Sequence, residues 1–213
     1  MLHTERLLLR PWRESDAESL YRYASDPAVG PAAGWHVHTD VENSRQIIRD
    51  FLSAEETYAI MLIGEGAPNG DGVLIEERVP IGEGAPNDDA VRKRNTGPIG
   101  SIGLMVGEKS NLVIGGDEGE IGYWIGVPYW GQGLVPEAVR ELLRHGFEDL
   151  GLKVIWCGYF DGNEKSRRAQ EKCGFRYHHT EKDKPWPLMG DIRTEHVTRL
   201  TKEEWLAEER GGG

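Results

Sequence analysis

The sequence predicts a mixed α/β domain, in which helices cover both faces of a single sheet. Candidate strands outnumber helices, and the helices are interspersed among them. Residues 136–150 have the clearest helical pattern and stand between two strand-like segments. Residues 153–160 form a near-continuous apolar run, typical of a strand that is buried on both faces. The length of 213 residues fits one domain over 1–210, with room for an insertion.

The first elements follow from local signals. Residues 5–10 predict a strand. Ser15 and Glu18 have capping-box spacing, which predicts a short helix that ends at Asp26-Pro27. The Gly/Pro/Ala-rich segment 28–36 predicts a loop.

A second helix and a second strand follow this loop. Thr39 and Glu42 repeat the capping-box spacing. The apolar face of the predicted helix is formed by Ile47, Ile48, Phe51 and Leu52. Residues 58–63 then predict a strand.

Residues 64–97 break the pattern, because Gly, Pro, Asp and Asn dominate them. The same seven-residue sequence, IGEGAPN, occurs at 63–69 and at 81–87. A solenoid needs at least about three stacked repeats, so one local duplication favours a flexible flap or hairpin inserted between the second and third strands. A functional lid is the alternative.

The second half predicts two strands at 98–106 and 118–127, before the helix 136–150. Pro136 suits the first turn of that helix, and Gly151 can cap its end. Asn163 can cap a further short helix that stops at Gly174. A last strand is predicted over 195–200, and the region of Trp186 and Trp205 is interpreted as packing of the C-terminal segment.

Composition excludes several classes of protein. A net charge of −11 argues against nucleic acid as the partner and favours a cationic one. No apolar run approaches the ~20 residues of a membrane span, and the N-terminus lacks a signal-peptide core. Cys157 and Cys173 are too few for a disulfide scaffold, which favours a cytoplasmic protein. His178-His179 with Cys173 lacks metal-ligand spacing; we interpret these histidines as exposed loop residues and expect no metal.

The segment 129–137, YWGQGLVPE, is the strongest candidate for a binding motif. It follows a strand and opens a helix, so glycines there leave backbone N–H groups uncovered beside the positive end of the helix dipole. Such a loop can hold a pyrophosphate without a basic side chain. Alone it is weak evidence, since an ordinary strand–turn–helix connection has the same pattern.

Five short motifs in fixed order add to this evidence. They are EIGYWI at 120–125, WGQG at 130–133, EA at 137–138, NEKS at 163–166 and CGF at 173–175. Together they resemble the GNAT superfamily of N-acetyltransferases, and specifically its RimJ/RimL-like branch of ribosomal-protein N-terminal acetyltransferases and small-molecule relatives. The resemblance covers nearly the whole chain except 64–97. It implies a mostly antiparallel twisted sheet with a splayed central strand pair, and acetyl-CoA as co-substrate.

The resemblance also implies roles for particular residues. The backbone of Gln132, Gly133, Leu134 and Val135 would hold the CoA pyrophosphate. The main chain of Ile125 and Val127 would pair with the pantetheine arm. Asn163 would hydrogen-bond that arm, and Ser166 would lie near the thioester sulfur. The loop 28–36 would cover the acceptor side, with Trp35 as a candidate wall.

Two positions depart from the superfamily pattern. Val135 stands where Gly or Ala is usual, so it is expected in an ordinary helical or extended conformation. Gln170 stands where many members carry a Tyr general acid, and Ser166 is then the better proton donor. Glu120 follows the pattern: it lies on the strand where related enzymes often carry a catalytic Glu, so the resemblance makes it the candidate base, against the alternative of a strand-end surface carboxylate. Trp124 is interpreted as core or pocket wall.

Lys165, Arg167 and Arg168 can reach the CoA 3′-phosphate or form a solvated basic face. The predicted activity is acetyl transfer to a primary amine by direct attack in a ternary complex. A different acyl donor, an alcohol acceptor, or a non-catalytic acyl-CoA sensor are the alternatives. The amine, whether a protein N-terminus or a small molecule, is left open, as is the choice between monomer and homodimer.

Overall fold

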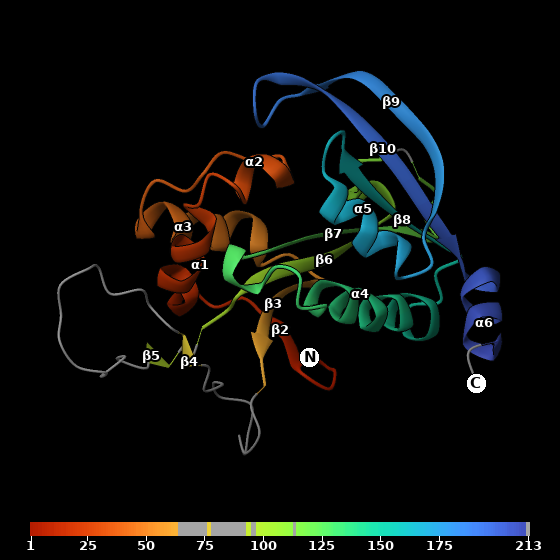
Figure 1. The fold of residues 1–213 in the computed structure, drawn as a ribbon, viewed down its shortest axis with the longest axis horizontal. Helices are drawn as coiled ribbons and strands as arrows, with labels where there is room; N and C mark the ends of the chain where they lie inside the picture. Colours follow the sequence, from red (N-terminus) through yellow and green to blue (C-terminus); the bar gives the residue numbers. More distant parts are fainter. Residues whose placement is uncertain (64–75, 78–92, 95–96, 113, 212–213) are drawn as a thin grey trace.

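The fold is built on one eight-stranded sheet in the order β1-β2-β3-β6-β7-β8-β10-β9 (Figure 1). The computed structural model describes residues 1–63, 76–77, 93–94, 97–112 and 114–211. Its strands are β1 (Leu2–His3), β2 (Leu7–Pro11), β3 (Thr57–Leu62), β4 (Glu76–Glu77), β5 (Lys93–Arg94), β6 (Gly100–Val106), β7 (Glu118–Ile125), β8 (Val154–Phe160), β9 (Arg176–Trp186) and β10 (Asp191–Thr201). Its helices are α1 (Ala17–Ala24), α2 (Gly30–Ala33), α3 (Val41–Ile47), α4 (Leu134–Arg144), α5 (Glu164–Glu171) and α6 (Lys202–Gly211).

The central strands β7 and β8 pair in parallel and then separate. Every other pair of neighbours in the sheet is antiparallel. The β7–β8 register runs from Glu118↔Val154 to Ile121↔Cys157, although the strands continue to Ile125 and Phe160. The predicted mixed sheet with a splayed central pair is therefore confirmed.

Helices pack on both faces of this sheet. Adjacent residues of a strand point to opposite faces, and Ala59 and Ile60 of β3 belong to different core clusters. Ala59 packs with Leu20 of α1 and Ile48, which follows α3. Ile60 belongs to the larger core, to which α4 contributes Leu134, Ala138, Val139, Leu142 and Leu143. The amphipathic pattern of α4 thus closes one face of the sheet.

Two predicted helix caps in the first half are wrong. A 3₁₀ turn, Glu14–Asp16, precedes α1, and the Asp16 carboxylate rather than Ser15 accepts a bond from the backbone N–H of Arg13. Asp40, not Thr39, caps α3 by accepting from the N–H of Asn43 at 2.7 Å. The predicted loop 28–36 also contains the one-turn helix α2.

The C-terminal strands also differ from the prediction. β9 was not expected, and it places His178-His179 on a strand instead of a loop. β10 begins at Asp191, earlier than predicted, and pairs with both β8 and β9. Only Ile155 and Cys157 of β8 are fully buried, so this strand is not covered on both faces.

The predicted insertion, 64–97, connects β3 to β6. Its two described strands, β4 and β5, pair antiparallel as a separate two-stranded sheet. Apart from Ile63, both copies of the repeated sequence, at 63–69 and 81–87, lie outside the described residues. That 64–97 is an insertion on one domain over 1–210 stays a prediction.

Candidate active site

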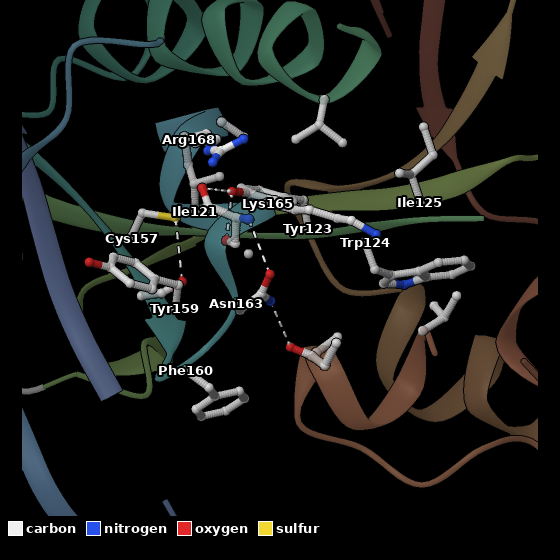
Figure 2. A pocket seen from close by; sticks show the side chains of 18 of the residues that line it. Ile121, Tyr123, Trp124, Ile125, Cys157, Tyr159, Phe160, Asn163, Lys165 and Arg168 are labelled. Atoms are coloured by element: carbon white, nitrogen blue, oxygen red, sulfur yellow. Dashed lines mark hydrogen bonds between the residues drawn. The ribbon is translucent and has the colours of Figure 1, made fainter. Parts of the chain in front are cut away.

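A cavity of about 460 Å³ opens where β7 and β8 separate. Strand residues 120–125 and 157–160, the loop before α4, helix α5 and helix α2 line it. In Figure 2 the side chains of Tyr123 and Asn163 lie near its middle, with Trp124 and Phe160 toward its sides. The splay leaves strand backbone without a neighbouring strand inside this cavity, where an extended ligand can pair with it.

The loop before α4 has the backbone conformation that an anion site requires. Gly131 and Gly133 have φ values of +75° and +77°, a backbone conformation that residues other than glycine rarely adopt. Gly133 is the N-cap of α4, which begins at Leu134, so the first N–H groups of the helix are not bonded within it. Val135 is the second residue of α4 and has the ordinary helical conformation that we expected.

A cluster of side chains from the N-terminal segment also contacts this loop. Arg6 donates to the Gln132 carbonyl at 3.1 Å and pairs with Glu137 of α4 at 2.6 Å. Glu137 also accepts from the Thr4 hydroxyl and from the backbone N–H of Arg6. The Gln132 side chain donates to the Pro128 carbonyl. The chain before β2 therefore fixes the geometry of the loop.

Basic side chains lie beside the loop. Lys165, Arg168 and Lys172 line the cavity, and the Lys165 ammonium lies 3.5 Å from the centroid of the Trp130 ring. Arg167 is instead paired with Glu164 and Glu171. Of the predicted basic group, Lys165 and Arg168 therefore face the cavity and Arg167 does not.

Glu120 is a buried carboxylate in the cavity wall, with 7% of its surface exposed. The Ser110 hydroxyl and the Asn111 N–H donate to its Oε2 at 2.7 and 2.9 Å. Within the described part of the chain no donor contacts Oε1, which leaves that oxygen for a ligand. Burial raises the pKa of Glu120, and these two hydrogen bonds offset part of the effect.

Glu195 is a second buried carboxylate of the cavity, and the sequence pattern indicated only that a strand begins there. Its Oε1 lies so close to Gly158 that a Cβ on that residue would clash with it. Its Oε2 pairs with the Lys184 ammonium at 2.7 Å. The glycine at position 158 is the only sign in the sequence that a side chain from another strand lies there. It becomes informative only once β8 and β10 are known to pair.

Asn163 and Ser166 meet at the start of α5. Asn163 caps the helix, with its Oδ1 accepting from the Ser166 N–H at 3.1 Å, and its Nδ2 donates to the Ala32 carbonyl at 3.3 Å (Figure 2). The Ser166 hydroxyl contacts the hydroxyl of Tyr123 and the amide of Gln170. Asn163 and Ser166 both line the cavity. They lie on the opposite side of β7 from Glu120.

Aromatic side chains form the remaining wall. The Trp35 ring packs edge-on against the Trp124 ring, with 5.7 Å between the ring centroids. Trp35 lies outside the cavity lining. Trp186 lines the cavity, donates to the Gly34 carbonyl at 2.7 Å and meets the Phe160 ring at 4.9 Å. The interpretation of Trp186 as C-terminal packing was therefore wrong, whereas Trp205 does pack on the buried Phe147 ring.

The structure thus brings most predicted site residues to one cavity. Those that line it are Glu120, Ile125, Gly133, Leu134, Val135, Asn163 and Ser166. Val127, Gln132 and Trp35 lie outside the lining. Among the described residues no group of His, Cys, Asp or Glu could hold a metal ion, and no helix is long and apolar enough to cross a membrane.

The sequence is similar to that of known acetyltransferases. A family profile described as "Acetyltransferase (GNAT) domain" matches residues 6–176. The uncharacterized N-acetyltransferase p20 of Bacillus licheniformis is 30% identical over 154 residues, covering 72% of this chain and 70% of that protein.

Solved structures show the same fold. An acetyltransferase (GNAT family) from Bacillus anthracis superposes with a TM-score of 0.69 at 22% identity, covering 95% of this chain and 98% of that one. A ribosomal-protein-S5-alanine acetyltransferase from Vibrio fischeri superposes with a TM-score of 0.62 at 18% identity, covering 95% and 97%. At these identities the likeness concerns the fold alone.

Proposed function

This chain belongs to the GNAT acetyltransferase family, and on that premise we propose that it transfers the acetyl group of acetyl-CoA to a primary amine. The observation that carries the proposal is the meeting, in one cavity, of a free strand edge, a helix N-terminus with uncovered N–H groups and the buried Glu120. An acyl-CoA has parts that match each of these features in order: an extended amide-containing arm, a pyrophosphate and a thioester.

The chain's own residues fit this ligand. The loop that ends at Gly133 would hold the pyrophosphate, and the unpaired part of β7 up to Ile125 would pair with the amide-containing arm. Lys165, Arg168 and Lys172 supply positive charge where the nucleotide phosphates would lie. The side-chain amide of Asn163 is already used to cap α5 and to hold Ala32, so its role toward the arm is first to shape the site.

Glu120 and Ser166 fit the two proton transfers of the reaction. An amine arrives protonated at neutral pH and must lose a proton before its nitrogen can attack the thioester carbon. Glu120 Oε1 can take that proton, because it has no protein donor among the described residues. As the carbon–nitrogen bond forms and the carbon–sulfur bond breaks, Ser166 can hydrogen-bond the sulfur that takes up negative charge. The attacking nitrogen then loses its second proton, which reaches the sulfur through the Ser166 hydroxyl, so the products are an amide and the CoA thiol.

Direct attack by the amine is favoured over an acetyl-cysteine intermediate. Cys157 lines the cavity at the last pair before the splay. Burial raises the pKa of its thiol well above the usual range, and a thiol that keeps its proton is a poor nucleophile. We therefore propose a ternary complex.

The charge of the acceptor side favours a cationic substrate. Glu120 and Glu195 are both buried there, and Lys184 is the ammonium paired with Glu195. Trp124, Phe160 and Trp186 give the same side an aromatic surface. The proposed acceptor is a protein N-terminus or a small-molecule amine, and a non-catalytic acyl-CoA sensor is the alternative that the same cavity would serve.

The test is release of free thiol from acetyl-CoA when pools of amines are added, with mass spectrometry of the product. We expect thiol release that depends on a primary amine and a product heavier by one acetyl group. Binding of acetyl-CoA without thiol release for any pool, including N-terminal peptides, polyamines and aminosugars, would favour the sensor.

The basic wall makes a separate prediction about the cofactor. Arg168→Gln should raise the Kd for CoA about tenfold while leaving the Kd for dephospho-CoA unchanged, because one phosphate contact is lost. Calorimetry with both ligands measures this. Arg167→Gln is the matched control, since that guanidinium is held by Glu164 and Glu171 and lies outside the cavity lining. Equal losses for both ligands would place the 3′-phosphate elsewhere.

A further inference from the structure

The Ser166 hydroxyl belongs to a hydrogen-bond chain that the sequence did not reveal. Tyr123 of β7 places its hydroxyl 2.9 Å from the Ser166 Oγ, although the two residues are far apart in the chain. Gln170, one turn later on α5, contacts the same Oγ through its Nε2 at 3.1 Å. Tyr123 and Ser166 line the cavity, and Gln170 is fully buried behind them.

The orientation of the Gln170 amide follows from its other partners. Its Nε2 lies 2.9 Å from the Gly158 carbonyl, which can only accept. Its Oε1 accepts from the Thr198 hydroxyl at 2.8 Å. The atom that faces Ser166 is therefore a donor, and it occupies one of the two lone pairs of the Ser166 oxygen.

The second lone pair of the Ser166 Oγ faces the hydroxyl of Tyr123. If its hydroxyl donates to the Ser166 Oγ, both lone pairs are used and the Ser166 proton must point elsewhere. The competing acceptor, the Ser166 backbone carbonyl, lies farther away at 3.3 Å, and shorter O–H···O contacts are the stronger ones. Burial also raises the pKa of Tyr123, so the phenol keeps its proton and remains a donor.

We propose that Tyr123 is a positioning residue that, together with Gln170, saturates the Ser166 oxygen and turns the Ser166 proton into the cavity, toward the sulfur of CoA. This inference rests on the proposed function. It accounts for an active site in which Gln170 stands at the position where many relatives are expected to carry a tyrosine. A tyrosine hydroxyl still reaches this point, but it comes from β7 and acts through Ser166.

The test measures the acidity of the bound thiol, which needs no amine. Ultraviolet absorbance of the thiolate gives the pKa of CoA bound to the protein. A hydrogen bond from Ser166 stabilises the thiolate, so Tyr123→Phe should raise the pKa of the bound thiol by about one unit, a tenfold change in its acid dissociation constant. Ser166→Ala should have the same effect, and the double variant should add little to it.

Turnover gives the second readout. Tyr123→Phe should lower kcat about tenfold with the KM for acetyl-CoA changed less than about twofold, because the lost contact acts on the leaving group rather than on binding. In the Ser166→Ala background the same substitution should have nearly no effect on kcat. Tyr58→Phe is the matched control: it removes another buried tyrosine hydroxyl, which donates to Glu56, and neither Tyr58 nor Glu56 lines the cavity.

Three outcomes would overturn the inference. CoA that binds normally, with the same thiol pKa in wild type and Tyr123→Phe, would show that Tyr123 does not orient Ser166. Additive losses of kcat in the double variant would assign Tyr123 a separate structural role. CoA that binds to neither protein would overturn the proposed function itself and this inference with it. Melting temperatures of all variants identify any that fail to fold.

Discussion

Glu120→Gln is expected to lower kcat/KM by about 10²–10⁴-fold, the usual loss when a general base is removed. Glutamine keeps the size of the side chain, and its amide oxygen can still accept from Ser110 and Asn111. Only the capacity to take a proton from the amine is lost. The measurement is kcat/KM against pH with two acceptors of different basicity.

The pH profile should identify the role of Glu120. A base works when deprotonated, and burial raises the pKa of this carboxyl, so wild-type activity should rise with pH through a step above the ordinary glutamate range. This step should be absent in Glu120→Gln. Acceptors of low pKa should suffer least, because more of each arrives already deprotonated.

The control is Glu118→Gln, on the same pleat of β7. Glu118 accepts from the Trp156 indole N–H and lies outside the cavity lining, so its loss should leave kcat/KM nearly unchanged. Near-full activity of Glu120→Gln with both acceptors would end its assignment as base and leave deprotonation to solvent.

Although Glu120→Gln should lower activity, it should not lower the stability of the fold at neutral pH. The raised pKa means that folded Glu120 keeps its proton at a pH where the unfolded chain has lost it, so its contribution to stability falls as pH rises through that window. Glu120→Gln removes this term. The variant should therefore melt no lower than wild type at neutral pH while it loses activity.

Gly133→Val is expected to weaken binding of acetyl-CoA by at least about tenfold. Gly133 has φ +77°, and a β-branched residue in this region costs on the order of 1–3 kcal/mol unless the loop rearranges. Rearrangement would move the N–H groups at the start of α4 away from the phosphates. Calorimetric titration with acetyl-CoA measures the loss.

Gly151→Val separates this effect from general strain. Gly151 has φ +72° at the far end of the same helical segment, and a Cβ there would meet nothing within 4 Å. Its substitution should lower Tm to a similar extent without changing the affinity for acetyl-CoA. Unchanged affinity in Gly133→Val would show that the loop is not the phosphate site.

Local signals in the sequence were sufficient for the elements nearest to the cavity. The amphipathic spacing of α4 and the glycines before it depend on neighbours in sequence, and the structure has both. The cap of α5 by Asn163 is equally local. The family resemblance located the same residues because its motifs are short and contiguous.

The features that were missed depend on contacts between distant segments. β9 is largely exposed and rich in charged and polar residues, so it has no apolar pattern by which to recognise a strand. Glu195 becomes a cavity residue only because β10 pairs with β8, which places Glu195 opposite Phe160 and its carboxylate against Gly158. The contact between Tyr123 and Ser166 likewise joins segments that only the fold brings together.

The separation of β7 and β8 also bears on how the protein shields a free strand edge from other chains. Exposed strand edges invite pairing with other chains and are a common route to aggregation. Here the free edge lies inside the molecule, between α4 and α5, where a single extended arm fits and a second β-sheet does not. The protein can therefore keep unpaired strand backbone for a ligand without offering it to another copy of itself.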